Sequence, residues 1–241
     1  MGTSVRPNGM SSAAAALRYW EHRQEVTSNN LANVSTGGFK GQKVFARMIE
    51  GALPVADGIT DLSQGSLQVT NNSRDLALEG RGFFVVKTPN GERYSRGGSV
   101  QVNDSGNLTD SSGNQLLGES GPIRVASHSN ADIASIQIGR DGTVTIDKAE
   151  VGRLRIETIP EKATLLAEGS GLFIPPTART RIEPDARIVR QGALEQSNVT
   201  PISQMVDMIS IQRAYTAVQK AVTTLDTVRA IATTELARPA N

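Results

Sequence analysis

The chain has 241 residues and no cysteine, which excludes disulfides, thiolate zinc sites and cysteine nucleophiles. Its 25 basic and 24 acidic residues give a net charge of +1, so the strong positive charge of a nucleic-acid-binding protein is missing. Hydrophobic residues make up 38% of the chain and aromatic residues only 4%, so a globular core must rest on Val, Ile and Leu, which favour strands.

The N-terminal residues 1–9 lack the apolar core of a secretory signal peptide. No stretch of the sequence approaches the roughly 18 apolar residues that a membrane-spanning helix needs. We therefore expect no membrane insertion, and if the chain leaves the cytoplasm, we expect it to use a route without a cleavable signal peptide.

A first helix is predicted over residues 10–33, where alanine is frequent and glycine and proline are absent. Leu17, Trp20 and Leu31 occupy positions of a coiled-coil seam, but half of that seam is polar. Gly37-Gly38 follows and marks the end of the helix. Because helices owe most of their stability to tertiary packing, this segment needs a partner to fold.

Short strands are predicted between residues 75 and 199, separated by glycine-containing turns such as Asn90-Gly91 and Asp141-Gly142. Strands at intervals of about 8–12 residues indicate a sandwich-like or barrel-like domain. Residues 35–74 match neither pattern and are predicted to be an extended connector. The predicted strands are Phe83–Val86, Val100–Val102, Ile136–Ile138, Val144–Ile146 and Leu154–Ile159.

A second helix is predicted from Pro201 to about Ala237, because proline suits the first helical turn and no further proline or glycine interrupts the segment. Its apolar residues step by three and four, which is typical of a coiled-coil seam. Beside this seam Ile202, Met205 and Ile209 form a second, shorter column. The seam residues are Met208, Ile211, Tyr215, Val218, Val222 and Leu225.

The expected fold class is α+β, with a central all-β domain, sandwich-like or barrel-like, flanked by N- and C-terminal helices that pair as a coiled coil. The expected domains are a terminal helical assembly domain (1–34 and 200–241), the extended connector (35–74) and the β-rich domain (75–199). Helices that pair with neighbouring molecules make heterologous contacts, which generate rings or filaments.

Residue patterns for chemistry are weak. His22 and His128 are expected at the surface, and the sequence Gly80-Arg81-Gly82 is expected to be a tight turn into a strand. The loop 104–110 lacks the ligand order of a calcium loop and is expected to form polar turns. The arginine-rich stretch 179–190 is interpreted as a solvated surface. We expect no enzyme activity, cofactor, metal or small-molecule substrate; a hydrolase using an unrecognised acid pair and a β-rich binding module or adhesin with a helical stalk stay open.

Three segments follow one another in the chain. The first is 28–40 (SNNLANVSTGGFK), the second is 75–86 (DLALEGRGFFVV) followed by 94–99 (YSRGGS), and the third is 191–202 (QGALEQSNVTPI), leading to 208–215 (MISIQRAY). In this order they resemble the flagellar rod and hook proteins. Gly37-Gly38 replaces the family's usual Pro-Gly or Asn-Gly pair. Within the family, Leu117–Ile123 is more similar to the proximal rod proteins than to the distal ones.

The resemblance implies a structural subunit of the bacterial flagellar basal-body rod, with other rod subunits and copies of itself as partners. It implies export by the flagellar type III apparatus and a place in the periplasmic rod, with the paired terminal helices forming the inner tube. It implies no partner among nucleic acids.

We expect the chain ends to be largely disordered in the free subunit and to fold on assembly. The asparagines near the end of the first helix are expected either to terminate it or to fix the register between subunits. The residues expected at the assembly interface are Leu17, Trp20, Asn29, Asn30, Leu31, Asn33, Met208, Ile211, Tyr215, Val218, Val222 and Leu225.

Overall fold

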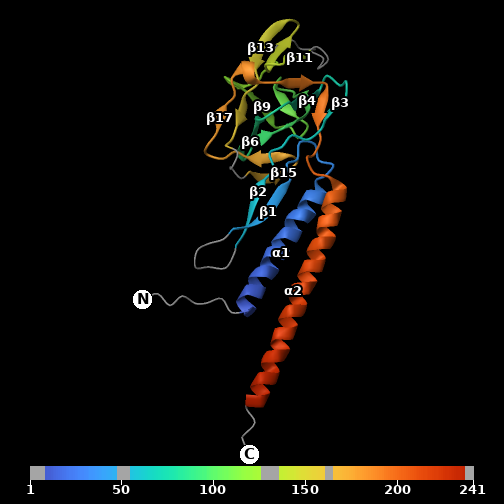
Figure 1. The fold of residues 1–241 in the computed structure, drawn as a ribbon. Coiled ribbons are helices and arrows are strands. Elements are labelled where there is room, and N and C mark those ends of the chain that lie inside the picture. The colour runs from blue at the N-terminus through green and yellow to red at the C-terminus, as the bar shows by residue number, and fades with distance from the viewer. Residues whose placement is uncertain (1–8, 48–54, 126–135, 161–164, 237–241) are drawn as a thin grey trace, which may run out of the picture. The chain divides into compact units, whose positions relative to one another are not determined.

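The computed structural model describes residues 9–47, 55–125, 136–160 and 165–236. These residues belong to two compact units, each described below by itself (Figure 1). The helical unit takes its described residues from the ranges Met1–Ala32, Gln42–Gly58 and Thr200–Asn241. The β unit consists of the described residues of Asn33–Gly41 and Ile59–Val199.

The helical unit contains the two predicted helices, α1 (Gly9–Ala32) and α2 (Pro201–Leu236). Pro201 stands at the first position of α2, and the N–H of Gln204 donates to the Thr200 carbonyl at 3.2 Å. Both helix predictions are therefore confirmed to within about two residues at their ends. Neither helix is long and apolar enough to span a membrane, and no other helix in the described ranges is.

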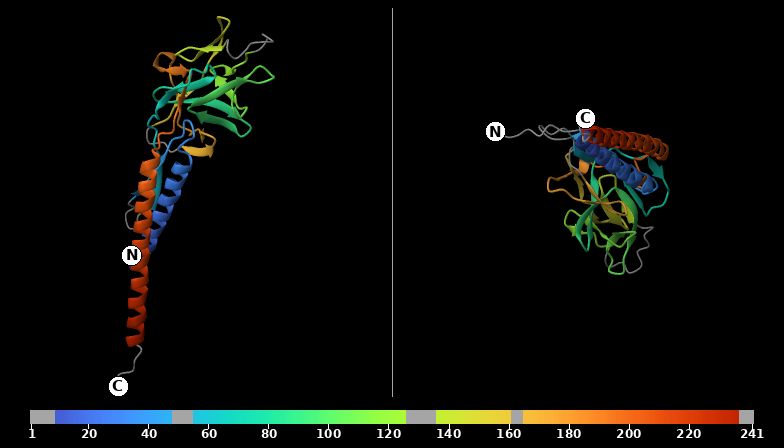
Figure 2. Two further views of the ribbon diagram at one scale, coloured as in Figure 1. Left: turned by 90° about the vertical axis from the view of Figure 1, so that its right-hand side faces the viewer. Right: turned by 90° about the horizontal axis from the view of Figure 1, so that it is seen from below.

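The two helices lie side by side and run in opposite directions (Figure 2). The Tyr215 hydroxyl donates to Glu21 Oε1 at 3.1 Å, and Asn30 Nδ2 donates to Gln204 Oε1 at 3.3 Å. Because α1 has 24 residues and α2 has 36, the C-terminal part of α2 continues beyond the start of α1.

The predicted connector contains strands. Strands β1 (Gln42–Arg47) and β2 (Val55–Thr60) form a two-stranded sheet. Strand β3 (Leu67–Val69) pairs with β19 (Ala193–Glu195), which precedes α2 in the sequence. The described part of the predicted extended connector therefore contains paired strands.

In the described part of the β unit, twelve strands form one antiparallel sheet that curves into a half-barrel (Figure 1). Its main path is β15-β16-β6-β5-β9-β8-β7-β4-β18, and β10, β14 and β17 branch from it. A smaller sheet consists of β11, β12 and β13, and β19 pairs with β3. A 3₁₀ turn covers Pro184–Ala186. The strands are β4 (Asp75–Leu78), β5 (Phe83–Thr88), β6 (Gly91–Ser95), β7 (Gly97–Val102), β8 (Leu108–Asp110), β9 (Gln115–Gly118), β10 (Gly121–Pro122), β11 (Ile136–Ile138), β12 (Thr143–Ile146), β13 (Ala149–Arg153), β14 (Ile156–Thr158), β15 (Leu166–Gly169), β16 (Leu172–Ile174), β17 (Thr180–Arg181), β18 (Val189–Gln191) and β19 (Ala193–Glu195).

Strand β5 explains how the core of the β unit is organised. Phe84 and Val86 enter one hydrophobic cluster, and Phe83 and Val85 enter a second cluster on the opposite face. Both faces of the strand are buried, which is why its sequence is a continuous apolar run and not an alternating one. In the second cluster Phe83 stacks on Tyr94, with 5.2 Å between ring centroids.

The strand predictions are confirmed at β5, β7, β11 and β12, whereas the run 154–159 forms strand only over Ile156–Thr158. The glycines of the predicted turns, Gly91 and Gly142, have the positive φ values expected of them. The sequence predicted a sandwich-like or a barrel-like domain, and the half-barrel matches the second of these.

The arginine-rich stretch requires a correction. Arg187 is only 5% exposed, and its guanidinium donates to the carbonyls of Ile182 at 2.6 Å and Leu154 at 2.9 Å. It also pairs with Glu119 at 2.7 Å. The prediction of a solvated surface is therefore wrong for Arg187, because carbonyl groups of the folded sheet replace its water shell.

Candidate functional site

The predicted seam of α2 lies on the side of that helix that faces α1. Ile211 is completely buried there, and Tyr215 bonds to Glu21 of α1. Leu225, at the far end of the seam, is 39% exposed. The remaining seam residues, Met208, Val218 and Val222, are half-buried.

The second column of α2 is exposed. Ile202 is 74%, Met205 53% and Ile209 51% exposed. Ile209 also borders a shallow groove along the helix that is lined by Gln212, Arg213, Thr216, Ala217 and Lys220. Val228 and Ile231, in the part of α2 that extends beyond α1, are exposed as well. Because exposed apolar columns of this kind mark contact surfaces, α2 presents a candidate interface to another molecule.

The predicted interface residues of α1 are less uniform. Leu17, Trp20 and Leu31 are half-buried, and Arg23 lies over the Trp20 ring at 5.5 Å from its centroid. Asn29 is exposed. Asn33 follows the helix and is half-buried in the β unit, where its carbonyl accepts from the N–H of Thr36 at 3.1 Å.

Asn30 differs from the other asparagines because it is buried, with 5% exposure. Its Oδ1 accepts from the N–H of Gln42 at 2.9 Å, and its Nδ2 donates to the Gln42 carbonyl at 2.8 Å. With the bond to Gln204, its side chain joins α1, β1 and α2 within one molecule. These three hydrogen bonds are not the contact between subunits that the sequence analysis considered.

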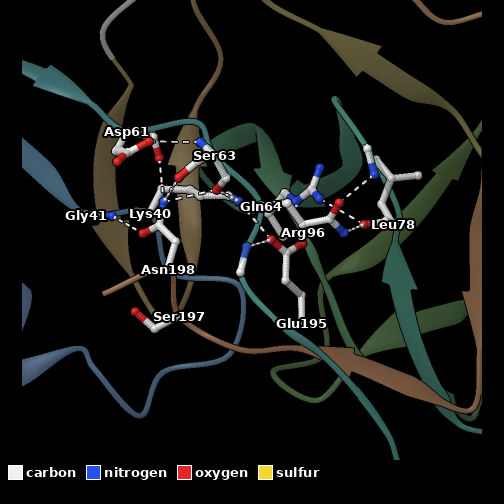
Figure 3. Close-up of polar contacts among 12 residues, drawn as sticks. Lys40, Gly41, Asp61, Ser63, Gln64, Leu78, Arg96, Glu195, Ser197 and Asn198 are labelled. Carbon is white, nitrogen blue, oxygen red and sulfur yellow. Dashed lines mark hydrogen bonds and ion pairs between the residues drawn. The ribbon is translucent and has the colours of Figure 1, made fainter. Parts of the chain in front are cut away.

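A second feature, inside the β unit, is a cluster of buried ions around Glu195 (Figure 3). Glu195 Oε1 accepts from Lys40 Nζ at 2.8 Å and from the N–H of Gly65 at 2.9 Å. Its other oxygen, Oε2, accepts from Arg96 Nε at 2.7 Å. The side chains of Lys40, Arg96 and Glu195 are at most 2% exposed. We call these three residues the ionic cluster.

Backbone carbonyls accept further hydrogen bonds from the two cations of the ionic cluster. Lys40 Nζ also donates to the Ser63 carbonyl at 2.6 Å, and Arg96 donates to the carbonyls of Leu78, at 2.8 Å, and Gly82. Burial lowers the pKa of the Lys40 ammonium, and the positive charge of Arg96 acts in the same direction, while Glu195 opposes both. The carboxylate of Glu195 is thus the main stabiliser of two buried cations.

Asn198 shares the Ser63 carbonyl with Lys40 of the ionic cluster (Figure 3). Its Oδ1 accepts from the N–H of Gly41 at 2.8 Å, and its Nδ2 donates to the carbonyls of Asp61 at 2.8 Å and Ser63 at 3.0 Å. Its own N–H donates to the Phe39 carbonyl at 3.3 Å. One asparagine therefore joins the segment that follows α1 to the segment that precedes α2.

Two glycines permit this close packing. Gly38 has a φ of +68°, and a Cβ there would lie 2.8 Å from the Cβ of Arg96. A Cβ on Gly65 would lie 1.9 Å from the carbonyl oxygen of Gln196. Larger residues at either position would force backbone or side chains apart.

The ionic cluster takes one residue from each of the three segments that carry the family resemblance: Lys40 from the first, Arg96 from the second and Glu195 from the third. The sequence alone assigned no role to these three residues. A signal was present, since each segment holds a charged residue among small or apolar ones. Their pairing was not predictable because 155 residues separate Lys40 from Glu195.

Another pair of carboxylates bears on the hydrolase alternative. Glu92 accepts from Arg155 at 2.9 and 2.7 Å, and the hydrogen bond with Arg155 lowers the pKa of Glu92. Glu157 accepts from Arg155 at 2.7 Å and from the Tyr94 hydroxyl at 2.7 Å. A general acid needs a raised pKa, so arginine pairing makes Glu92 unsuited to that role.

The remaining sequence candidates lie as follows. His22 is half-buried and 3.5 Å from Glu25, while His128 falls outside the described residues. In the loop 104–110 and the turn after it, Asp110 Oδ1 accepts from the N–H groups of Ser112 at 2.9 Å and Asn114 at 2.8 Å, so the prediction of polar turns is confirmed there. Among the described residues, no group of three or more His, Asp or Glu side chains is arranged to hold a metal.

Three family profiles match the chain in order. The profile described as "Flagella basal body rod protein" matches residues 9–40. The "Flagellar hook protein FlgE/F/G D1 domain" matches 77–146, and "Flagellar basal body rod FlgEFG protein C-terminal" matches 190–234. The first and last matches cover α1 and most of α2.

Individual relatives agree with these profiles. The chain is 32% identical over 212 residues to the flagellar basal-body rod protein FlgF of Caulobacter vibrioides, covering 81% of this chain and 84% of the relative. It is 34% identical over 236 residues to FlgF of Salmonella typhimurium, covering 85% and 88%. It is 31% identical over 238 residues to the rod protein FlgG of Buchnera aphidicola from Acyrthosiphon pisum, covering 83% and 89%.

Proposed function

This chain belongs to the family of flagellar basal-body rod proteins, and on that premise we propose that it is a structural subunit of the flagellar rod that assembles through its terminal helices. The observation that carries the proposal is the exposed apolar column of α2, Ile202, Met205 and Ile209. Burial of a large aliphatic side chain contributes about 1.5–3 kcal/mol, so this column stabilises an assembly and not the isolated chain. The chain is not an enzyme, because the proteins of this family are structural.

The assembly interface that we propose uses two faces of α2, the seam and the exposed column. The seam of α2 pairs with α1 as a coiled coil, and the exposed column contacts neighbouring subunits, which are other rod proteins or copies of this chain. The proposed residues are Leu17, Trp20, Asn29, Asn30, Leu31, Asn33, Met208, Ile211, Tyr215, Val218, Val222 and Leu225.

A place in the proximal rod is part of the proposal. The support is the identity with FlgF of Salmonella typhimurium, which at 34% slightly exceeds the 31% with FlgG of Buchnera aphidicola. The distal rod is the alternative. Incorporation into rods that stop at each stage of assembly would distinguish the two positions.

We also propose that the subunit reaches the periplasmic rod through the flagellar export apparatus, without a cleavable signal peptide and without insertion into the membrane. The ends of the free subunit are then largely disordered and fold on assembly, which suits passage through a narrow channel. Mass spectrometry of the subunit recovered from rods tests the first point, since a shortened N-terminus contradicts an uncleaved chain.

The substitution Leu225→Asp tests the interface. Leu225 is 39% exposed at the end of the seam, and a carboxylate there must be desolvated on assembly. We expect loss of incorporation into rods with an unchanged circular dichroism signal from the β unit. Thr224→Asp is the matched control, because Thr224 is the exposed neighbour outside the seam, and it should still incorporate. Rods that contain the Leu225→Asp subunit would contradict the proposal.

A further inference from the structure

The chain leaves α1 and enters α2 through two segments that bond to each other inside the β unit. The N–H of Gly38 donates to the Glu195 carbonyl at 2.8 Å, and the N–H of Asn198 donates to the Phe39 carbonyl at 3.3 Å. The N–H of Gly41 donates to Asn198 Oδ1 at 2.8 Å. These bonds lie six to nine residues after the last residue of α1 and three to six residues before the first residue of α2.

Buried charge makes the docking of the two segments interdependent. Glu195 arrives with the segment before α2, and Lys40 arrives with the segment after α1. Arg96 lies between strands β6 and β7 of the large sheet and pairs with Glu195. Its guanidinium lies over the Phe83 ring, 5.7 Å from the ring centroid. If the segment with Glu195 leaves, Lys40 and Arg96 lose the carboxylate that they share in the interior; if the segment with Lys40 leaves, Glu195 loses one of its two cations. Both losses are unfavourable.

We propose that Lys40, Arg96 and Glu195 act as an ionic clasp, that is, as positioning residues that hold the end of α1 and the start of α2 next to each other. This inference rests on the proposed function, because it concerns helices that assemble. Without the clasp, pairing of α1 with α2 must close a loop of more than 160 residues, from Ala32 to Pro201. With the clasp closed, the chain entropy of closing this loop is already lost when the β unit folds. The effective concentration of each helix near the other therefore rises.

The clasp can open without loss of the hydrophobic core. None of its three residues belongs to the two hydrophobic clusters, which are built on strands such as β5 and β6. The segments that it ties are held by these polar contacts, by the short pairing of β19 with β3 and by the buried side chains of Phe39 and Ala193, which belong to neither cluster. Opening of the clasp and unfolding of the core are therefore separable in an experiment.

The experiment uses the full chain, whose lack of cysteine allows a specific crosslink. Gly9→Cys and Leu225→Cys place a thiol pair on α1 and α2, since a Cβ on Gly9 would lie 3.7 Å from Leu225 Cδ1. The rate of disulfide formation between them, measured in dilute monomer, reports how often the two chain ends meet, whether or not the helices are folded before assembly. We expect Glu195→Gln in this background to slow the crosslink about tenfold.

Hydrogen exchange on the same proteins separates positioning from general stability. In the Glu195→Gln chain the amides of Gly38, Gly41 and Asn198 should exchange about tenfold faster, while the amides of β5 and β6 stay within about twofold. Equal acceleration in β5 and β6 would overturn the proposal, since Glu195 would then only support the core. The proposal would also be overturned if these three amides exchanged faster but the crosslink rate stayed the same. It would equally be overturned if their exchange rates did not change.

Two further variants test the ionic character of the clasp. Adding Lys40→Met to Glu195→Gln removes one of the two cations that lose the Glu195 carboxylate and should restore part of the crosslink rate, whereas a further decrease would contradict an ionic clasp. Glu79→Gln is the matched control, because Glu79 pairs with Arg190 at 2.7 Å on the surface, and it should leave rate and exchange unchanged.

A milder substitution covers the case in which Glu195→Gln prevents folding. Asn198→Asp keeps an oxygen to accept from Gly41 but loses the donor to the Asp61 and Ser63 carbonyls. The same pattern is expected, with a slower crosslink and intact β5 and β6. If Leu225→Asp failed to block incorporation into rods, the proposed function would be contradicted. The crosslink result would still test the clasp, because it is measured in the monomer.

Discussion

The β unit and the helical unit solve the burial of apolar side chains in opposite ways. All four residues of β4 and the first four of β5 are buried, whereas in the described part of α2, from 201 to 234, Ile211 alone is. The sheet shields its side chains within one molecule because it curves around them. A long helix cannot do so, and its exposed Ile202 and Met205 require another surface. The comparison separates a unit that shields its apolar side chains within one molecule from a unit that, on our proposal, assembly completes.

Polar groups follow the same division. In the β unit Arg187 is buried and donates to two carbonyls and one carboxylate, whereas Arg190, three residues later, forms a surface pair with Glu79. Buried polar groups of this kind are fully hydrogen-bonded and fix one arrangement of the chain. On α2 many threonines bond only to carbonyls of their own helix, for example Thr227 to Thr223 at 2.9 Å.

Limited proteolysis should give the largest contrast between the two units. If the chain ends are largely disordered in the free subunit, a protease should remove both helices and leave a resistant core that contains residues 33–41 and 59–199. Mass spectrometry of the fragments provides the boundaries. Resistance through to Leu225 would show that the helices pack stably within one molecule and would end the disorder proposal.

A pair of alanine substitutions should sharpen the contrast in energy. Leu108, with 0% exposure, lies in the larger hydrophobic cluster, and Leu108→Ala should cost the β unit about 2–5 kcal/mol of unfolding free energy. Ile202→Ala, at 74% exposure, should change the stability of the monomer by no more than about 0.5 kcal/mol. Urea unfolding measures both. Similar losses at the two sites would mean that α2 is packed in the free subunit.

Acid should produce the smallest effect, confined to the β unit. The hydrogen bond from Arg155 lowers the pKa of Glu92 below the usual 4.5, so this pair stabilises the fold above that pH and loses its contribution as pH falls through the folded-state pKa. Glu92 is 34% exposed and solvent screens the pair, so Glu92→Gln should cost about 0.2–1 kcal/mol at pH 7. Urea midpoints at pH 7 and pH 3 measure the difference, which should shrink in acid; an equal difference at both values would contradict this account.

The elements with strong local patterns were predictable. Pro201 and the three-and-four spacing defined α2, and the run Phe83–Val86 defined β5. The strands β1 to β3 were not, because their side chains lack a regular alternation and their pairing depends on distant residues such as Ala193. The interface residues remain a proposal, since they concern contacts with other molecules.

The sequence by itself determined the two helices, most of the strong strands and the family, because these depend on neighbouring residues and on ordered short segments. Only the tertiary structure decided which polar residues are buried. The roles of Lys40, Arg96 and Glu195 became visible when residues up to 155 positions apart met in one interior. The physical reason is that a charge has no fixed preference along the chain: its partner and its loss of water are set by the fold.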